Sequence, residues 1–464
     1  MFRFFTAPHT LGDVLFELRS ALGPTFRFRI GLHTLIVTCD PKDCSRIAGR
    51  PAEWRRPPAM DMIMNTIVPG GLFSTTLPDH AELRRKLRGV FGPAMLPEFW
   101  PAFQKEMAKM VERMERASKG ADGIGGNIGQ GGGVGAVSGH EVDLVTAYGN
   151  AAYGFIFNVA FGAAYDQATM DRVIAVNAAL LKAMMPDIVG YPVLQWKLFA
   201  PLRLRARLLE ATASLRAHYG ALVDARLAEA PSDAAARPTD LLDAIVALGG
   251  SDREVMVSNA FIFGSAGGVT TAEAASWATY RIITASGCLD AVTAELEAVV
   301  GPPGTRLEFG HIERLTYLKA CWKESLRLTP PGIFFERVAT RDSVLQVDGR
   351  VVPAGTHVMA FFGAAQRDPA LWLHPEAFEP ARWMPGGSAV ATGADIPPGA
   401  YIPFSVGPNN LRLAVPPDAV RALTGWALRP ACDDPAGPPG NLSRGVPVLL
   451  TPRATTGVVT QQAP

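Results

Sequence analysis

The sequence lacks several features that define large classes of protein, and each absence narrows its function. Its 44 Lys and Arg residues against 43 Asp and Glu residues leave a formal net charge of +1, with no long basic run, so a general nucleic-acid binder is excluded. Its five cysteines are an odd number, and Cys39-x4-Cys44 is too isolated to form a zinc site. We expect reduced thiols in a reducing compartment and a cytoplasmic protein.

Long apolar runs are also lacking. No run reaches the ~18–20 residues that a membrane-spanning helix needs, and the nearest, residues 151–165, is interrupted by Asn158. Residues 1–5, MFRFF, lack the apolar core of a signal peptide. The chain as written is expected to be soluble. Association with the surface of the endoplasmic reticulum membrane is expected only if an N-terminal anchor is missing from it.

The residues that are present predict one mostly α domain with small β-sheets. Hydrophobic residues make up 48% of the 464 residues and charged residues 19%, which is enough for a sizeable core. Residues 25–40 alternate with a period of two, typical of short strands, and strand and turn signals return after Pro330. Between these two regions helical spacing dominates. It begins at residue 80 and continues over residues 97–118, 141–228, 252–285, 290–300 and 311–328. There is no internal repeat, so we predict a single domain over residues 1–464.

Residues 120–139 hold ten glycines in twenty positions. This composition is typical of a flexible low-complexity loop, which we predict to be an insert on the surface. Its Gly131-x-Gly133-x-x-Ala136 is similar to a dinucleotide-binding fingerprint, but no strand precedes it, so that interpretation is set aside.

An ordered set of motifs carries the functional interpretation. Glu324 and Arg327 lie three apart on a predicted helix and can therefore pair, which taken alone describes a common surface ion pair. Pro330 ends that helix, and Phe378-x-Pro380-x-Arg382 follows. This order strongly resembles the cytochrome P450 family, the haem-thiolate monooxygenases. The resemblance implies a triad in which Arg327 and Arg382 hold the Glu324 carboxylate, and breaking such a buried pair costs ~3–5 kcal/mol.

The resemblance extends upstream to residues 266–271, Ala-Gly-Gly-Val-Thr-Thr, in the middle of the longest predicted helix. In the family this segment serves oxygen activation, which implies that Gly267 leaves room for O2 and that the Thr270 hydroxyl helps to deliver protons. Glycine inside a helix costs ~1 kcal/mol relative to alanine, so two in succession require a reason, and a close helix crossing is the alternative one. The family usually has an acid before the threonine pair, and Val269 occupies that position here.

Cationic residues match the positions that bind the haem propionates in the family. His80 and Arg84 are four apart and share a helix face, and Arg337 matches a further propionate-pairing arginine. Cations suit this task because propionates are anions and charge-assisted hydrogen bonds are strong. The resemblance thus implies haem as the cofactor, and it covers the chain from the first strands to about Pro452.

The segment that defines the family departs from its pattern. The family has Phe-x-x-Gly-x-Arg-x-Cys-x-Gly, whose cysteine thiolate is the axial ligand of the haem iron. Here Phe404 and Gly407 match, but Asn409 replaces the arginine and Leu411 replaces the cysteine, so no metal ligand is predicted. Residues 419–430 look like the end of the next helix, and the stretch before them is short by roughly one to two helical turns. Two interpretations stay open: a degenerate member without thiolate ligation, and a mis-assembled gene model that skipped the cysteine codons.

At the level of the family, the resemblance implies a haem-dependent oxidoreductase. It would insert one oxygen atom of O2 into a small apolar substrate, with electrons from an NADPH-dependent reductase or a ferredoxin. Two other functions stay open: a non-catalytic relic of the fold that binds a hydrophobic ligand or a partner protein, and a haem-dependent isomerase or dehydratase. The isomerase needs no acid before Thr270 but still needs the cysteine. We expect no nucleic-acid partner.

Overall fold

The computed structural model shows a mostly helical molecule with small sheets, as the sequence predicts, and the residues that it describes form three sheets. It describes residues 11–30, 33–76, 79–87, 95–118, 140–162, 165, 168–171, 173–176, 200–229, 240–249, 252–387, 396–406, 426–430 and 447–452. The glycine-rich segment 120–139 and the residues around Leu411 lie outside the described residues.

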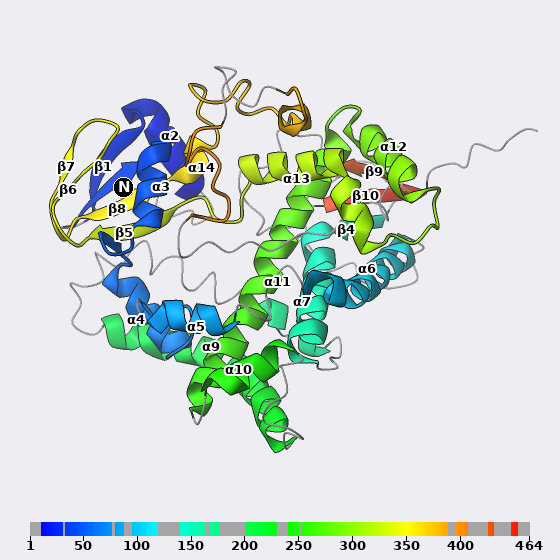
Figure 1. Cartoon of the computed structure of the whole chain (residues 1–464), viewed down its shortest axis with the longest axis horizontal. Helices are drawn as coiled ribbons and strands as arrows, with labels where there is room; N and C mark the ends of the chain where they lie inside the picture. Colours follow the sequence, from blue (N-terminus) through cyan, green and yellow to red (C-terminus); the bar gives the residue numbers. More distant parts are fainter. Residues whose placement is uncertain are drawn as a thin grey trace, which may run out of the picture.

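The largest sheet has five strands in the order β1-β2-β8-β5-β3 and joins the N-terminal region to residues 335–360. Its strands are β1 (Thr25–Ile30), β2 (His33–Thr38), β3 (Trp54–Arg55), β5 (Phe335–Ala339) and β8 (His357–Ala360). The period of two predicted β1 and β2 because neighbouring residues enter different clusters: Ile36 packs on one face of the sheet and Val37 on the other. Helices α2 (Leu11–Leu22), α3 (Pro41–Gly49) and α14 (Phe362–Ala365) lie beside this sheet, and β6 (Ser343–Val344) and β7 (Val351–Val352) form a separate hairpin (Figure 1).

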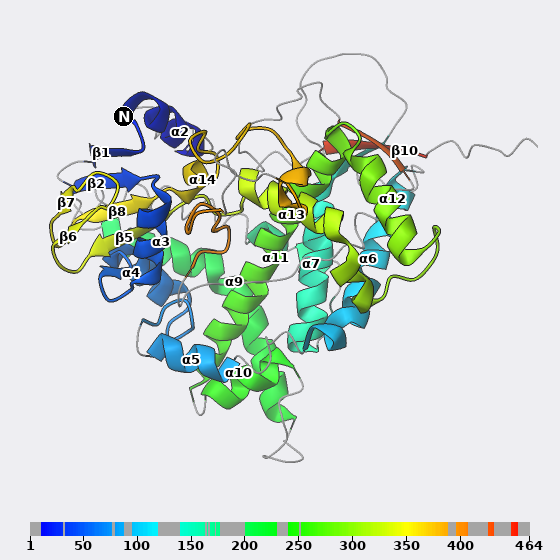
Figure 2. The same cartoon turned by 45° about the horizontal axis from the view of Figure 1, so that its top comes forward.

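The remaining helices form the larger part of the molecule around α11 (Arg253–Thr284), which crosses its centre (Figures 1 and 2). The Asp252 carboxylate accepts hydrogen bonds from the amides of Glu254 and Val255, so α11 begins where the sequence predicts. The other helices are α4 (Pro58–Ile67), α5 (Asp79–Leu87), α6 (Leu96–Ser118), α7 (Leu144–Phe161), α9 (Ala200–Ala228), α10 (Leu241–Gly249), α12 (Cys288–Val300) and α13 (Thr316–Leu328). The segment predicted as one helix over 311–328 is divided at Leu315 into the 3-10 helix η3 (Phe309–Arg314) and α13.

The third sheet joins distant parts of the chain. Strand β4 (His140–Asp143) pairs with β10 (Pro447–Pro452), which pairs in turn with β9 (Trp426–Pro430). The prediction that residues 419–430 end a helix is therefore wrong for 426–430, which are extended. The predicted helix extended into β9 because local sequence does not show that the backbone of β9 forms its hydrogen bonds with β10, a later segment of the chain.

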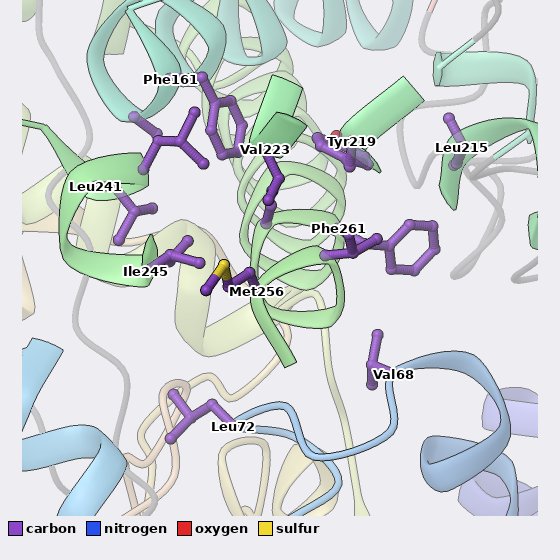
Figure 3. Close-up of a cluster of buried hydrophobic side chains, with 14 of the residues drawn as sticks. Val68, Leu72, Phe161, Leu215, Tyr219, Val223, Leu241, Ile245, Met256 and Phe261 are labelled. Carbon is purple, nitrogen blue, oxygen red and sulfur yellow. The ribbon is translucent and has the colours of Figure 1, made fainter. Parts of the chain in front are cut away.

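An apolar cluster packs around the first half of α11. Figure 3 shows Phe261 and Met256 of α11 beside Tyr219 and Val223 of α9 and Ile245 of α10, all buried. Among the described helices, α11 alone is long and apolar enough to cross a membrane, but 61% of its apolar window is buried inside the protein. This burial is typical of a core helix.

Candidate functional site

Glu324 is the centre of a buried charge network. Its carboxylate accepts hydrogen bonds from Arg327 Nε (2.9 Å) and Nη2 (2.8 Å) and from Arg382 Nε (2.9 Å), and all three side chains are buried. The Trp383 indole donates to it at 2.8 Å and the Glu379 amide at 3.1 Å. Burial alone would raise the pKa of Glu324. The hydrogen bonds and the positive charge of Arg327, together with the charge of Arg382, outweigh burial and lower this pKa. The structure thus brings the three predicted triad residues together.

The two arginines connect α13 to the segment that follows α14. Arg327 Nη1 donates to the carbonyls of Gln366 (2.9 Å) and Pro375 (2.6 Å), and Arg382 Nη1 donates to that of Leu373 (3.0 Å). Every donation satisfies a backbone carbonyl that the irregular chain leaves without a partner in a helix or strand. The network therefore fixes the path of residues 366–383 against α13, including η4 (Pro380–Trp383).

Gln366 extends this network toward Phe404, and sequence reasoning gave it no role. Its Nε2 donates to the carbonyls of Leu326 (3.1 Å) and Arg327 (3.0 Å), while its Oε1 accepts from the Ile402 amide at 3.1 Å. Phe404 itself is half-buried two residues later. Gly407 and Leu411 lie outside the described residues, so Phe404 is the part of the predicted ligand segment that can be placed.

Gly267 and Gly268 of α11 lie where this helix crosses α7. A Cβ added to Gly267 would lie 2.3 Å from Ile156 Cδ1, and one added to Gly268 would lie 2.4 Å from Tyr153 Cε1. Helix α11 packs along α7 more extensively than along any other described element. The close crossing, which the sequence left as the alternative reason for these glycines, therefore accounts for both. The role of Gly267 toward O2 stays a prediction.

Thr270 lies on the less buried side of α11. Its hydroxyl donates to the Ala266 carbonyl at 3.0 Å, and its side chain is exposed, whereas Gly268 and Ala272 are buried. Residues 266, 270 and 273 share one stripe of the helix because they are spaced by four and three. That stripe is the side of α11 that the rest of the helical core does not cover.

Glu273 lies on this stripe one helical turn after Val269, and sequence reasoning missed it. Its side chain is half-buried, and burial alone raises its pKa to about 7. A carboxyl group is therefore present on the same helix face as Thr270, three residues after it. The signal was the spacing of three from Thr270, which a comparison of single aligned positions does not use.

A cluster of cations lies between α4, α5 and β5. Arg337 donates to the neighbouring Glu336 carbonyl at 2.8 Å, and burial, followed by the charge of Arg56, lowers its pKa to about 10. The carboxylates that act on Arg337 have other partners: Asp61 binds Arg56 at 2.5 Å, and Glu336 binds His357 at 2.5 Å.

His80 belongs to the same cluster. Burial and then the charges of Arg84 and Arg56 lower its pKa. Arg56 acts on both His80 and Arg337, so these residues and Arg84 share one cationic region. The Arg56 side chain also donates to the carbonyls of Ser74 (3.2 Å) and Thr75 (3.1 Å). The role of His80, Arg84 and Arg337 toward haem propionates stays a prediction. Such a region favours an anionic ligand because it would relieve the mutual repulsion of the cations.

Comparison with known proteins agrees with this arrangement. The sequence model of the family Cytochrome P450 matches residues 2–410. The chain belongs to the cytochrome P450 family. The match ends one residue before Leu411, at the point where the cysteine pattern of the family fails in this sequence.

Several relatives share parts of the chain. Cytochrome P450 78A11 of Oryza sativa subsp. japonica is 32% identical over 279 residues, which are 55% of this chain and 49% of that protein. Human Cytochrome P450 4F12 is 33% identical over 162 residues, 34% of this chain and 29% of its own length. Cyclooctatin synthase of Streptomyces melanosporofaciens is 32% identical over 171 residues, 36% and 35% of the two chains. The chain thus matches about half or less of the length of these relatives.

Haem is the cofactor of this family, and the described residues fit one side of it. The cationic cluster suits the propionates, because Asp61 pairs with Arg56 and Glu336 pairs with His357 rather than with Arg337. The axial side does not fit, because Leu411 has no donor atom. Within the described part of the chain, no group of three or more His, Cys, Asp or Glu side chains could hold a metal ion.

Proposed function

We propose that this protein is a haem-dependent oxidoreductase of the monooxygenase type whose site is intact on the propionate side and incomplete on the ligand side. The observation that carries the proposal is the half-buried Arg337, whose acidic neighbours are bound to Arg56 and His357. An anionic group between Arg337, His80 and Arg84 would complete the charge balance of this region.

The chemistry of the proposed reaction is divided between the cofactor and the chain. Haem would supply the activation of O2 for insertion into an apolar substrate, provided that it had a thiolate ligand. On the protein side, the Thr270 hydroxyl and the Glu273 carboxyl provide groups that hold and pass protons along one face of α11. Electrons would come from an NADPH-dependent reductase or a ferredoxin.

The site as written lacks the sulfur that this chemistry needs. Phe404 follows the Gln366 network, but Leu411 offers nothing to the iron. We therefore expect the protein to bind haem through its propionates with poor affinity, and monooxygenation to require a ligand loop that residues 409–417 do not contain.

Titration with haem tests the propionate side directly. We expect Arg337→Gln to weaken binding about tenfold relative to the parent, since one charge-assisted pair contributes about 1.4 kcal/mol or more. Arg116→Gln is the control, because Arg116 pairs with the exposed Glu112 on α6, away from this cluster. Equal binding by Arg337→Gln and the parent would remove the support for haem in this region.

The second candidate is a non-catalytic relic of the fold that binds a hydrophobic ligand. Two replacements favour it, Leu411 for the ligand and Val269 for the acid. The same haem titration separates the two functions. If the protein is a relic, neither the parent nor Arg337→Gln will show a saturable Soret band.

We also propose one domain over residues 1–464 and a cytoplasmic location. The sheet that pairs β4 with β10 supports the single domain, because it pairs His140 with Leu450. The Gly-rich segment 120–139, directly before β4, is proposed as a surface insert.

A further inference from the structure

Cys288 and Cys321 form a pair of thiols that the proposed function does not use. Cys288 is the first residue of α12, Cys321 lies on α13, and their sulfur atoms are 3.6 Å apart. Both side chains are buried, at 4% and 0% exposure, and both thiols are free. A contact between two sulfur atoms across two helices is the arrangement from which a disulfide can form.

The surroundings make Cys288 the more reactive of the two. A hydrogen bond from the Cys321 thiol lowers the pKa of Cys288, burial opposes this effect, and the Tyr317 hydroxyl, 3.6 Å from the sulfur, lowers the pKa further. The N-terminus of α12 adds a positive end of the helix dipole at the same residue. We therefore expect Cys288 to react first with an oxidant, and Cys321 to react afterwards with the oxidised Cys288.

Access to this pair is through the turn that precedes α12. Ser286 and Gly287 are exposed, and Gly287 has a left-handed backbone (φ 69°) with no atom within 4 Å of the place where a Cβ would stand. Cys288 is thus the buried residue that directly follows an exposed turn. A small oxidant needs only a local movement of this turn to reach the sulfur.

We propose that Cys288 and Cys321 are a redox modification site that a hydroperoxide converts into a disulfide between α12 and α13. The Cys288 thiolate attacks the peroxide oxygen, which breaks the O–O bond, releases an alcohol or water and leaves a sulfenic acid. The Cys321 sulfur then displaces water from that sulfenic acid, so two thiols and one hydroperoxide give one disulfide, one water and one alcohol or second water. The bond would tie α12 to α13 one turn before Glu324.

Cys39 and Cys44 provide the matched control inside the same chain. Both are free and fully buried, but burial raises the pKa of Cys39 to about 12 and raises that of Cys44 as well. The Cys44 thiol faces the Thr38 carbonyl at 3.6 Å. We therefore expect these two thiols to react at least about tenfold more slowly with peroxide than Cys288 does.

The experiment treats the native full-length protein with hydrogen peroxide, blocks the remaining thiols by alkylation after unfolding, and maps the peptides by mass spectrometry. We expect the number of free thiols to fall from five to three and a linked peptide to contain Cys288 and Cys321. Cys44→Ala should leave this link unchanged. Cys321→Ser, which keeps a hydrogen-bond donor beside Cys288, should abolish the link and leave Cys288 as a trapped sulfenic acid.

The mapping of the parent protein stands even if a cysteine variant fails to fold. The proposal is overturned if Cys288 and Cys321 are recovered as alkylated thiols after the treatment. It is equally overturned if Cys39 and Cys44 are oxidised as fast, or if Cys288 is linked to a second molecule rather than to Cys321.

Discussion

Glu324 is a carboxylate without access to water, and two arginines and an indole occupy its oxygen atoms. A buried pair of this kind contributes little net stability compared with apolar packing, but the loss of one partner leaves the others as uncompensated buried charges. The triad is therefore best understood as a device that fixes the path of residues 366–383 against α13.

The variant Glu324→Ala tests this interpretation. It leaves Arg327 and Arg382 buried without a carboxylate, so we expect a loss of about 3–5 kcal/mol in the free energy of unfolding or insoluble expression. Glu112→Ala removes an exposed pair with Arg116 on α6 and should cost less than about 1 kcal/mol. Equal melting temperatures of the parent and Glu324→Ala would reduce the network to an ordinary ion pair.

Glu273 predicts a dependence of stability on pH. Its pKa of about 7 in the folded protein lies above the ordinary value of 4.5, so the folded state favours the neutral carboxyl. Below about pH 4.5 both states bind the proton and the residue has no effect, whereas above about pH 7 folding must bear the cost of a buried carboxylate.

Glu273→Gln should therefore gain stability over the parent as the pH rises from 5 to 8, by roughly 3 kcal/mol at the upper end. Chemical denaturation at the two pH values measures this, with Glu297→Gln on the exposed face of α12 as the surface control. A constant difference between variant and parent would show that Glu273 is ionised and solvated.

At the scale of the element, the crossing of α11 and α7 depends on glycine. We expect Gly268→Ala to cost about 1–3 kcal/mol, since the new methyl group would meet the buried ring of Tyr153. Gly267→Ala is the matched comparison: its methyl group would meet the flexible end of Ile156 and should cost less. Thermal unfolding of both variants decides the order, and a cheaper Gly268→Ala contradicts the crossing as described.

The ligand loop is the element that the chain lacks. A thiolate site needs a cysteine, backbone amides that point at the sulfur and a helix that fixes its distance. We expect Leu411→Cys alone to leave haem binding without thiolate character, and a full-length loop of the family pattern in place of residues 409–417 to restore it. Success of the single substitution would show that the loop was never shortened.

Failure of the full loop would also be informative. His80, Arg84, Arg337 and the triad are all in place, so a complete loop should find an intact site around it. If it does not, changes have spread through the pocket, and the degenerate-relic interpretation is favoured over an error in the gene model.

The sequence could predict the elements that are stabilised by residues close to them in the chain, and it missed those that depend on distant partners. The limits of α6 and α11 follow from local spacing and from the Asp252 cap, and the period of two found β1 and β2. Strand β9 was missed because its partner is β10. Arg56 was missed because it approaches Arg337 only when β3, the strand just before it, pairs with β5. Glu273 could have been found only by asking which residues share a helix face with Thr270, because it does not occupy the motif position of the family's acid.

At the scale of the whole molecule, the chain has the architecture of its family with one incomplete centre. The sheet around β8 and the sheet of β4 and β10 join distant parts of the sequence, and α11 runs between them (Figure 2). The network of Glu324 and the cluster of Arg337 are both present, and the sulfur ligand of the family is the part that Leu411 does not supply.

Absorbance of the reduced, haem-loaded protein with carbon monoxide tests this most directly. Thiolate ligation gives a Soret band shifted to longer wavelength, and Leu411 cannot supply a thiolate. We predict weak haem binding and an unshifted band. A clear shifted band would contradict the absence of a thiolate ligand, and Cys432→Ala would then be the first variant to examine.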